Sequence, residues 1–223
     1  MIAEVAWGTL LNAMGPFKAS QRPAPTPDTD DTVELTGLVR LAAAGDPIAT
    51  RRFLDAVWPT LARVVSGVLG SRHPEVDDVI QQSLIAVVHA LSAFRGECHP
   101  AGYASRITLH VALRARRNAA VRRARNDSFA QSAAPELDDS AWPSDEVASE
   151  RRKRALRDLL QDLPEEQADA LGLRVVLGWS LDEVAKASGV PVNTVRSRVR
   201  LAKEALRRRI AADPTLAADL ELP

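Results

Sequence analysis

Residues 180–210 read SLDEVAKASGVPVNTVRSRVRLAKEALRRRI. Ser180 is followed three residues later by Glu183, which is the capping-box pattern that starts a helix. Gly189 then allows a tight turn, because glycine adopts positive φ without a steric cost. From Val192 onward an apolar residue recurs every three or four positions. The stretch therefore predicts a short helix, a turn and a longer helix, which is the layout of a helix-turn-helix.

The second helix of this motif carries a polar and basic face opposite its apolar stripe. Arginine binds guanine bidentately or neutralises phosphates, and short polar side chains near a helix N-terminus approach base edges closely. We therefore expect this helix to contact duplex DNA; the alternative is a solvated basic surface on an ordinary helical hairpin. The predicted DNA-reading residues are Asn193, Thr194, Arg196, Ser197, Arg198 and Arg200.

The composition of the 223 residues favours an all-α protein. Only 4% of the residues are aromatic, and strand-rich folds normally carry more aromatic and β-branched side chains. The single cysteine, Cys98, excludes an intramolecular disulfide framework and fits a reducing compartment. No apolar run approaches the length of about 18 residues that a membrane span needs, so we expect a cytoplasmic protein.

The net charge of zero is the sum of blocks of opposite sign. Residues 95–126 hold eight arginines against one glutamate, and residues 190–210 hold seven basic residues against one glutamate. Between these blocks, residues 127–150 hold seven acidic residues and no basic one. Blocks of this kind report on binding partners more than on fold. Both basic blocks suit a nucleic-acid partner.

Composition and periodicity divide the chain into two small helical domains joined by a flexible acidic linker. A flexible linker of this length has a typical span of roughly 27 Å, so the two domains can occupy separate places on one partner. The predicted boundaries are an irregular extension at 1–32, a first domain at 33–125, the linker at 126–149, a second domain at 150–211 and a tail at 212–223.

The first domain contains one clear amphipathic helix after residue 75. Asp77, Asp78, Gln81 and Gln82 form its polar face. An earlier helix is expected to start at Asp46 and Pro47, an N-cap and first-turn pair, and to kink or break at Pro59. The apolar face of the helix after residue 75 is predicted to comprise Val76, Val79, Ile80, Leu84, Val87, Val88, Leu91 and Phe94.

A loop at 95–102 and an arginine-dense helix at about 102–125 complete the first domain. The loop region mixes aromatic and polar side chains, among them Phe94, His99 and Tyr103. Bases stack on such rings while arginines follow the backbone, so this part suits single-stranded nucleic acid. A solvated helix face or an RNA-binding tail are the alternatives.

Two longer stretches carry a family resemblance. VDDVIQQSLIAVVHALSAFRGE, residues 76–97, resembles region 2 of bacterial sigma factors of the sigma-70 family. The stretch at 156–206 resembles their region 4, most closely in LPEEQ, SLDEVA and PVNTVRSRV. The layout without an intervening region 3 is similar to the extracytoplasmic-function (ECF) subgroup.

This resemblance implies a transcription initiation factor and not an enzyme. Region 4 would read the −35 promoter element through the six residues of the second helix given above and approach the β flap of RNA polymerase. Region 2 would dock on the β′ clamp helices of the core polymerase through Asp77, Asp78, Gln81 and Gln82. It would also recognise and melt the −10 element, with Arg95, His99, Tyr103, Arg106, His110, Arg114 and Arg117 as the matching residues.

The sequence departs from the family pattern at several positions of region 2. Leu84 stands where an aromatic residue is common, Tyr103 replaces a frequent Trp, and His110 replaces a common Asn. Ala104 and Ser105 stand in place of a common aliphatic or aromatic pair. We expect the smaller number of aromatic residues to weaken melting or to shift base preference.

The resemblance also implies control by an anti-sigma factor, because members of the subgroup are often held by such a partner. We expect no cofactor, metal or small-molecule substrate, since the histidines show no ligand spacing and no phosphate-binding loop is present. Cys98 and His99 are adjacent, either as an incidental loop pair or with a redox or metal role. A free-standing helix-turn-helix regulator and a metal enzyme are the alternative functions.

Overall fold

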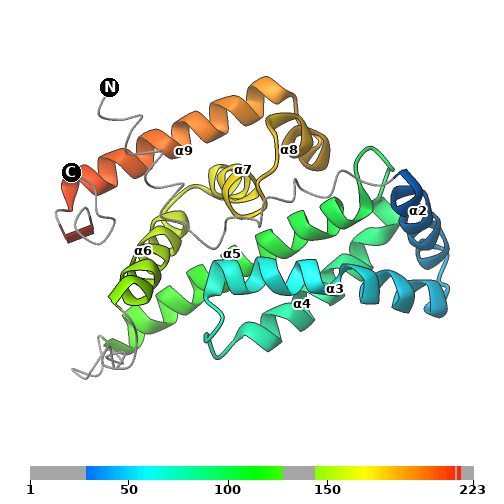
Figure 1. Cartoon of the computed structure of the whole chain (residues 1–223), viewed down its shortest axis with the longest axis horizontal. Helices are drawn as coiled ribbons and strands as arrows, with labels where there is room; N and C mark the ends of the chain where they lie inside the picture. The colour runs from blue at the N-terminus through cyan, green and yellow to red at the C-terminus, as the bar shows by residue number, and fades with distance from the viewer. Residues whose placement is uncertain (1–28, 128–143, 214, 217–223) are drawn as a thin grey trace.

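The computed structural model describes residues 29–127, 144–213 and 215–216. These residues form helices and connecting loops and contain no strand, which confirms the all-α prediction (Figure 1). The helices are α2 (Thr29–Ala43), α3 (Pro47–Leu69), α4 (Val76–Ala90), the 3-10 turn η1 (Leu91–Ala93), α5 (Pro100–Asp127), α6 (Ser144–Gln161), α7 (Glu165–Val176), α8 (Leu181–Ser188) and α9 (Val192–Ala212).

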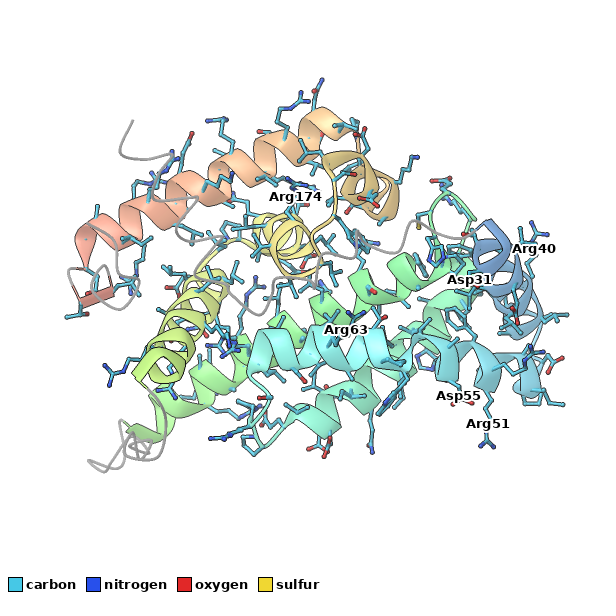
Figure 2. All side chains as sticks on the ribbon, in the orientation of Figure 1. Asp31, Arg40, Arg51, Asp55, Arg63 and Arg174 are labelled. Carbon is cyan, nitrogen blue, oxygen red and sulfur yellow. The ribbon has the colours of Figure 1, made fainter. Side chains whose placement is uncertain are left out.

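Helix α3 begins where the sequence predicts and continues past its proline. The Asp46 Oδ1 atom accepts hydrogen bonds from the backbone N–H groups of Ile48 (2.8 Å) and Ala49 (3.1 Å), which satisfies the first turn. Of the kink or break predicted at Pro59, the break is wrong, since the helix is continuous from residue 47 to 69, and the kink stays a prediction. Pro59 lies on the exposed side of α3, so water can satisfy the carbonyl freed one turn earlier at Asp55, a residue that points outward in Figure 2.

Helices α2 to α5 form the first domain around a core of their own. Phe53, Val57 and Leu61 of α3 are buried and pack with Leu91 of η1 and Ala104 of α5. In Figure 1 the long α5 helix runs beside both α3 and α4. This packing holds the arginine-dense helix as a rigid element of the first domain.

Two helices begin inside segments that the sequence suggests are irregular. Helix α2 starts at Thr29, within the predicted extension at 1–32, and α6 starts at Ser144, within the predicted linker. Pro143 directly precedes α6, in keeping with the preference for proline at a helix start. The other parts of the predicted extension, linker and tail, at 1–28, 128–143 and 217–223, lie outside the described residues.

Helices α6 to α9 form the second domain, which packs directly on the first. Leu159 and Leu171 belong to the same buried cluster as Val65 of α3 and Leu109 of α5. In Figure 1 helix α7 lies between α5 and α9. The two domains therefore share one buried apolar cluster, which is separate from the core that belongs to the first domain alone. Among the described residues no helix is long and apolar enough to cross a membrane.

Candidate nucleic-acid interface

The helix-turn-helix predicted from residues 180–210 is present with its capping interactions. The Ser180 Oγ atom accepts from the Glu183 N–H (3.2 Å), and the Glu183 carboxylate accepts from the Ser180 N–H (2.7 Å). Gly189 ends α8 with φ of 65°, in the left-handed region that favours glycine. These local interactions define the start and the end of α8.

Helix α9 presents most of the predicted DNA-reading residues to solvent. Its apolar stripe packs against α7 and α8, which turns the opposite face outward. Arg196 donates to the Asn193 Oδ1 atom (2.7 Å), and Arg200 pairs with Glu204 one turn later (2.7 Å). Thr194 is half-buried, and the exposed members of the set are Asn193, Arg196, Ser197 and Arg200.

Arg198 differs from the other arginines of this face. Its side chain is only 23% exposed, and its guanidinium lies 2.7 Å from the Glu166 carboxylate of α7. The residue therefore ties α9 to α7 within the second domain. The spacing of apolar residues along α9 does not indicate this ion pair.

The aromatic pair at the start of α5 is held by contacts within the first domain. The Tyr103 hydroxyl donates to the Ala90 carbonyl (3.0 Å), and its ring lies 5.2 Å from the Phe94 ring in a tilted arrangement. Both side chains are half-buried. The ring of Tyr103 is thereby fixed beside the loop that joins η1 to α5.

The other residues predicted for this part lie in the loop before α5 and along the first half of that helix. Arg95 and Arg114 are exposed, whereas Arg106 is half-buried. The His99 Nδ1 atom accepts from the Ala101 N–H (3.2 Å), and burial lowers the pKa of His99, opposed by the charge of Asp31. The lowered pKa favours the neutral form of His99, and its contact with Ala101 helps to order the start of α5.

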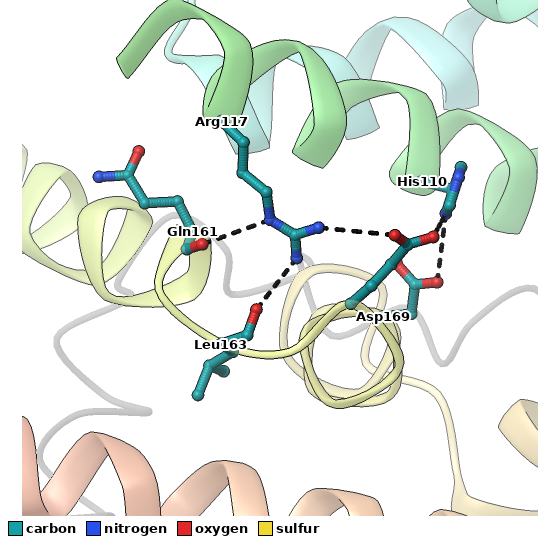
Figure 3. Close-up of polar contacts among 6 residues, drawn as sticks. His110, Arg117, Gln161, Leu163 and Asp169 are labelled. Carbon is teal, nitrogen blue, oxygen red and sulfur yellow. Dashed lines mark hydrogen bonds and ion pairs between the residues drawn. The ribbon is translucent and has the colours of Figure 1, made fainter. Parts of the chain in front are cut away.

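His110 and Arg117 face the second domain, as Figure 3 shows. The His110 Nδ1 atom lies 3.2 Å from the Glu165 carboxylate and 3.5 Å from that of Asp169. Arg117 donates to the carbonyls of Gln161 (3.3 Å) and Leu163 (3.2 Å), and its charge lies 3.9 Å from Glu165. Two residues predicted to contact DNA are thus occupied by protein groups.

Asp169 is the most buried carboxylate of this cluster. Burial raises its pKa, and the charge and hydrogen bond of His110 oppose that rise. Glu165 nearby raises the pKa further, while Arg106 lowers it. One carboxylate oxygen, Oδ1, is buried without a hydrogen-bond partner. The pairing with His110 therefore offsets only part of the cost of burying this charge.

Arg116, which the site prediction leaves out, is the most buried arginine of the contact. It is 6% exposed and donates to the Val68 carbonyl (3.2 Å), the Arg157 carbonyl (3.1 Å) and the Asp158 carboxylate (2.5 Å). These partners come from α3 and α6. Arg116 thus links the two domains, and within a run of arginines nothing in the sequence distinguishes it from its neighbours.

The polar face of α4 lies open to solvent. Asp77, Asp78, Gln81 and Gln82, the residues predicted to contact the polymerase, are all exposed. Ile85 continues this face and is 57% exposed, and Val88, which the sequence places on the apolar face of the helix, is 37% exposed. An apolar patch bordered by carboxylates and amides is therefore available to a partner on α4.

The loop before α5 carries the adjacent residues Cys98 and His99. Within the described ranges, no group of three or more His, Cys, Asp or Glu side chains can hold a metal ion. Cys98 is a half-buried free thiol whose pKa is raised mainly by burial. A raised pKa keeps the thiol protonated, which lowers its reactivity.

Comparison with protein families identifies both domains. Residues 50–122 match the model described as Sigma-70 region 2, and residues 153–206 match Sigma-70, region 4. Together the two matches cover more than half of the chain. The chain belongs to the sigma-70 family. The region 2 match spans α3, α4 and most of α5, and the region 4 match runs from within α6 to within α9.

Curated relatives place this sigma factor in the ECF subgroup. It is 29% identical over 164 residues to the ECF RNA polymerase sigma-E factor of Haemophilus influenzae, covering 71% of this chain and 84% of that protein. It is 27% identical over 187 residues to the ECF RNA polymerase sigma factor SigC of Mycobacterium tuberculosis, covering 81% and 94%. Sigma factors are transcription initiation factors and not enzymes, which removes the metal-enzyme alternative.

Two solved structures are also similar to this sigma factor. CnrH, solved in complex with the cytosolic domain of CnrY, has a TM-score of 0.48 and 21% identity, with 81% of this chain and 99% of that chain covered. The sigma factor RpoE of Bartonella quintana, solved with the anti-sigma factor NepR, has a TM-score of 0.43 and 18% identity, with 73% and 97% covered.

Proposed function

We propose that this sigma factor binds core RNA polymerase and directs initiation at promoters that carry both a −10 and a −35 element. The observation that carries the proposal is the exposed face of α9 in an intact helix-turn-helix. Asn193, Arg196 and Ser197 stand in the first turns of the second helix, the part that enters the major groove in this motif. In this proposal α9 reads the −35 duplex.

The start of α5 and the loop before it are proposed to bind the −10 element as single-stranded DNA. The tilted pair of Tyr103 and Phe94 offers ring surface for an unstacked base, and exposed Arg95 and Arg114 can follow the backbone. His110 and Arg117 belong to the same predicted basic surface, and in this structure both contact region 4. We call the set Arg95, His99, Tyr103, Arg106, His110, Arg114 and Arg117 the −10 surface.

Docking on the polymerase is assigned to the exposed face of α4. Protein interfaces combine an apolar centre with a polar rim. On α4, Ile85 and Val88 can form the apolar centre. Asp78 and Gln81 can form the polar rim. We propose the β′ clamp helices as the partner of this face and the β flap as a partner of region 4, as the family resemblance implies.

The test is reconstituted transcription with the purified chain and core polymerase on a library of randomised promoters. We expect transcripts to start downstream of a shared pair of elements. A free-standing regulator would instead bind duplex DNA tightly and specifically without polymerase, which a gel shift detects. Folded protein that neither binds core polymerase nor selects a promoter would refute the proposal.

Control by an anti-sigma factor is the remaining part of the proposal and rests on the resemblance to the ECF subgroup. The test is to add the product of the adjacent gene to the reconstituted reaction. Stoichiometric inhibition that is relieved by excess sigma factor supports a protein inhibitor. Inhibition that persists whatever the amount of sigma factor contradicts it.

A further inference from the structure

One arginine of helix α9 is held by a helix that lies outside the helix-turn-helix. Arg198 lies 2.7 Å from the carboxylate of Glu166, which stands in the first turn of α7. Only 23% of the Arg198 side chain is exposed, whereas 72% of the Glu166 side chain is exposed. The guanidinium therefore has limited access to a partner outside the protein, while the carboxylate beside it is open to solvent.

The two other arginines predicted to read DNA have partners on α9 itself. Arg196 donates to the amide oxygen of Asn193, which is a neutral group. Arg200 is exposed and pairs with Glu204 one turn later. An exposed ion pair between neighbouring turns of one helix contributes little to stability. Arg196 and Arg200 can therefore exchange these partners for DNA at little cost, whereas Arg198 is tied to another helix.

The position of Arg198 around the helix places it beside DNA and not over the bases. Val195 and Val199 are buried and face the protein, whereas Ser197 is exposed on the opposite side. Arg198 follows Ser197 by one residue, which is about 100° around the helix. The major groove is about 12 Å wide, so a helix inside it presents its outer face to the bases and its sides to the phosphate backbones. In the proposed complex Arg198 therefore lies on a side of α9 that faces a backbone.

A second ion pair lies further along the same side of α9. Arg209 follows Arg198 by eleven residues, which is three turns of an α-helix, so both side chains leave the helix in the same direction. The Arg209 guanidinium lies 3.7 Å from the carboxylate of Asp162, in the turn between α6 and α7. The two arginines are about 16 Å apart along the helix axis. Of these two pairs, the one formed by Arg198 and Glu166 is therefore nearer to the turns proposed to enter the groove.

We propose that Glu166 is a positioning residue of the −35 interface, which holds the guanidinium of Arg198 back from the DNA backbone. The inference rests on the proposed reading of the −35 duplex by α9. A free guanidinium at this place would neutralise a phosphate, and such a contact adds affinity for duplex DNA of any sequence. The ion pair with Glu166 leaves no net positive charge there. Binding by α9 therefore depends more on Asn193, Arg196 and Ser197, which are exposed on its outer face.

The expected size of the effect follows from the charge of one guanidinium. Each phosphate that a protein neutralises adds about 0.9 to the slope with which the logarithm of the binding constant falls against the logarithm of the salt concentration. Between about 1 M and about 0.1 M salt, that change in slope corresponds to about eightfold in affinity. Release of Arg198 should therefore tighten binding about eightfold at about 0.1 M salt, and equally for every duplex sequence.

The test variant is Glu166→Ala, which removes the carboxylate and leaves Arg198 in place. The Glu166 side chain is mostly exposed and alanine favours a helix, so we expect the variant to fold normally. The matched control is Asp162→Ala, which removes the same charge and releases Arg209 on the same side of α9. This control separates the release of Arg198 from a general gain of positive charge. Circular dichroism checks that both variants keep their helix content.

The binding measurement uses holoenzymes that differ only in the sigma factor. Each holoenzyme is titrated onto a labelled duplex that carries the −35 element found in the transcription assay. The duplex ends before the −10 element, so that melting does not contribute. A second duplex of the same length and scrambled sequence reports binding that is independent of sequence. Fluorescence anisotropy at several salt concentrations gives the affinity for each duplex and its dependence on salt.

We expect Glu166→Ala to bind both duplexes about eightfold more tightly than Asp162→Ala at about 0.1 M salt, with a slope that is steeper by about 0.9. The ratio of the affinities for the two duplexes should stay the same, because a phosphate contact carries no sequence information. In a chain that already carries Arg198→Ala, adding Glu166→Ala should have no larger effect than adding Asp162→Ala. A residue that only stabilised the fold would change Tm and leave the dependence on salt as it is.

Three results would overturn the proposal. An affinity and slope equal to those of the control would mean that Arg198 does not reach DNA when it is released. Weaker binding would mean that the ion pair holds Arg198 onto DNA. Tighter binding that persists without Arg198 would assign the effect to repulsion of phosphate by Glu166 itself. Each of these results leaves the proposed function in place if the unaltered holoenzyme initiates transcription and prefers the −35 duplex. Failure of the function appears instead as a lack of initiation by the unaltered chain.

Discussion

The replacement Arg196→Ala tests the proposed reading of the −35 element at a single side chain. Arg196 is exposed, and the contact seen for its guanidinium is with Asn193, three residues earlier on the same helix face. An exposed polar pair of this kind adds little to stability, so the variant should fold normally. We therefore expect Arg196→Ala to change DNA binding and not the fold.

The expected size follows from the chemistry of base recognition. A bidentate contact between arginine and a base discriminates by about 1–3 kcal/mol, which is roughly a 5- to 150-fold change in promoter preference. An arginine that touches phosphate would instead weaken all promoters about equally. Arg208→Ala is the matched control, because it removes the same charge from the exposed side of the last turns of α9.

The assay is competition between promoters that differ at single −35 positions, transcribed by the holoenzyme in one reaction. Arg196→Ala is expected to lose discrimination at one or two adjacent positions, whereas Arg208→Ala keeps the full preference. Arg198→Ala is expected to lower the midpoint of thermal unfolding slightly as well, since the ion pair with Glu166 is only partly exposed. Unchanged preference at every −35 position for Arg196→Ala would refute the reasoning.

Three further outcomes are expected. Asp78→Ala combined with Gln81→Ala should weaken binding to core polymerase in an anisotropy titration while the helix content stays the same; normal affinity would mean that the docking face lies elsewhere. Leu171→Ala should lower the free energy of unfolding by about 2–5 kcal/mol in chemical denaturation, because this side chain is buried. Leu201 is exposed, so Leu201→Ala should lower it by less than about 1 kcal/mol. Equal losses for the two variants would contradict the described core. Burial raises the pKa of Asp169 above its usual 3.8, so the free energy of unfolding should fall as pH rises through the raised pKa. Asp169→Asn should therefore flatten the dependence of Tm on pH. Equal slopes of Tm against pH for the variant and the unaltered chain would count against a buried acid.

The helix-turn-helix could be predicted in detail because its determinants are local. The Ser180 and Glu183 pair lies within one turn, and Gly189 needs only its own backbone conformation to end α8. The same holds for Asp46, whose side chain caps the helix that starts next to it. Signals that act over three or four residues are visible in a single sequence.

Predictions for exposed residues of a helix were less accurate. Pro59 predicted a kink or a break, and the helix does not break there because Pro59 lies on the exposed side of α3, where water can replace the lost hydrogen bond. Val88 fits the apolar spacing of α4 and is nevertheless 37% exposed, next to exposed Ile85. Periodicity identifies the apolar face of a helix, but the neighbouring helices decide how much of that face is buried.

The packing of region 4 on region 2 could not be predicted from the sequence. Leu109 of region 2 and Leu171 of region 4 share one buried cluster, which only the three-dimensional structure shows. Arg116 and Arg117 belong to a basic run that indicates nucleic acid, yet the structure gives both of them protein partners. Contacts between residues more than 40 positions apart leave no pattern within a single sequence.

Reconstituted initiation tests the central claim most directly. The purified chain is mixed with core RNA polymerase and a library of linear promoter fragments, and the starts of the transcripts are sequenced. The account predicts starts that require the added chain and that follow one −10 element and one −35 element at a constant spacing. Folded protein that binds duplex DNA specifically by itself but yields no transcripts above those of core polymerase would contradict it.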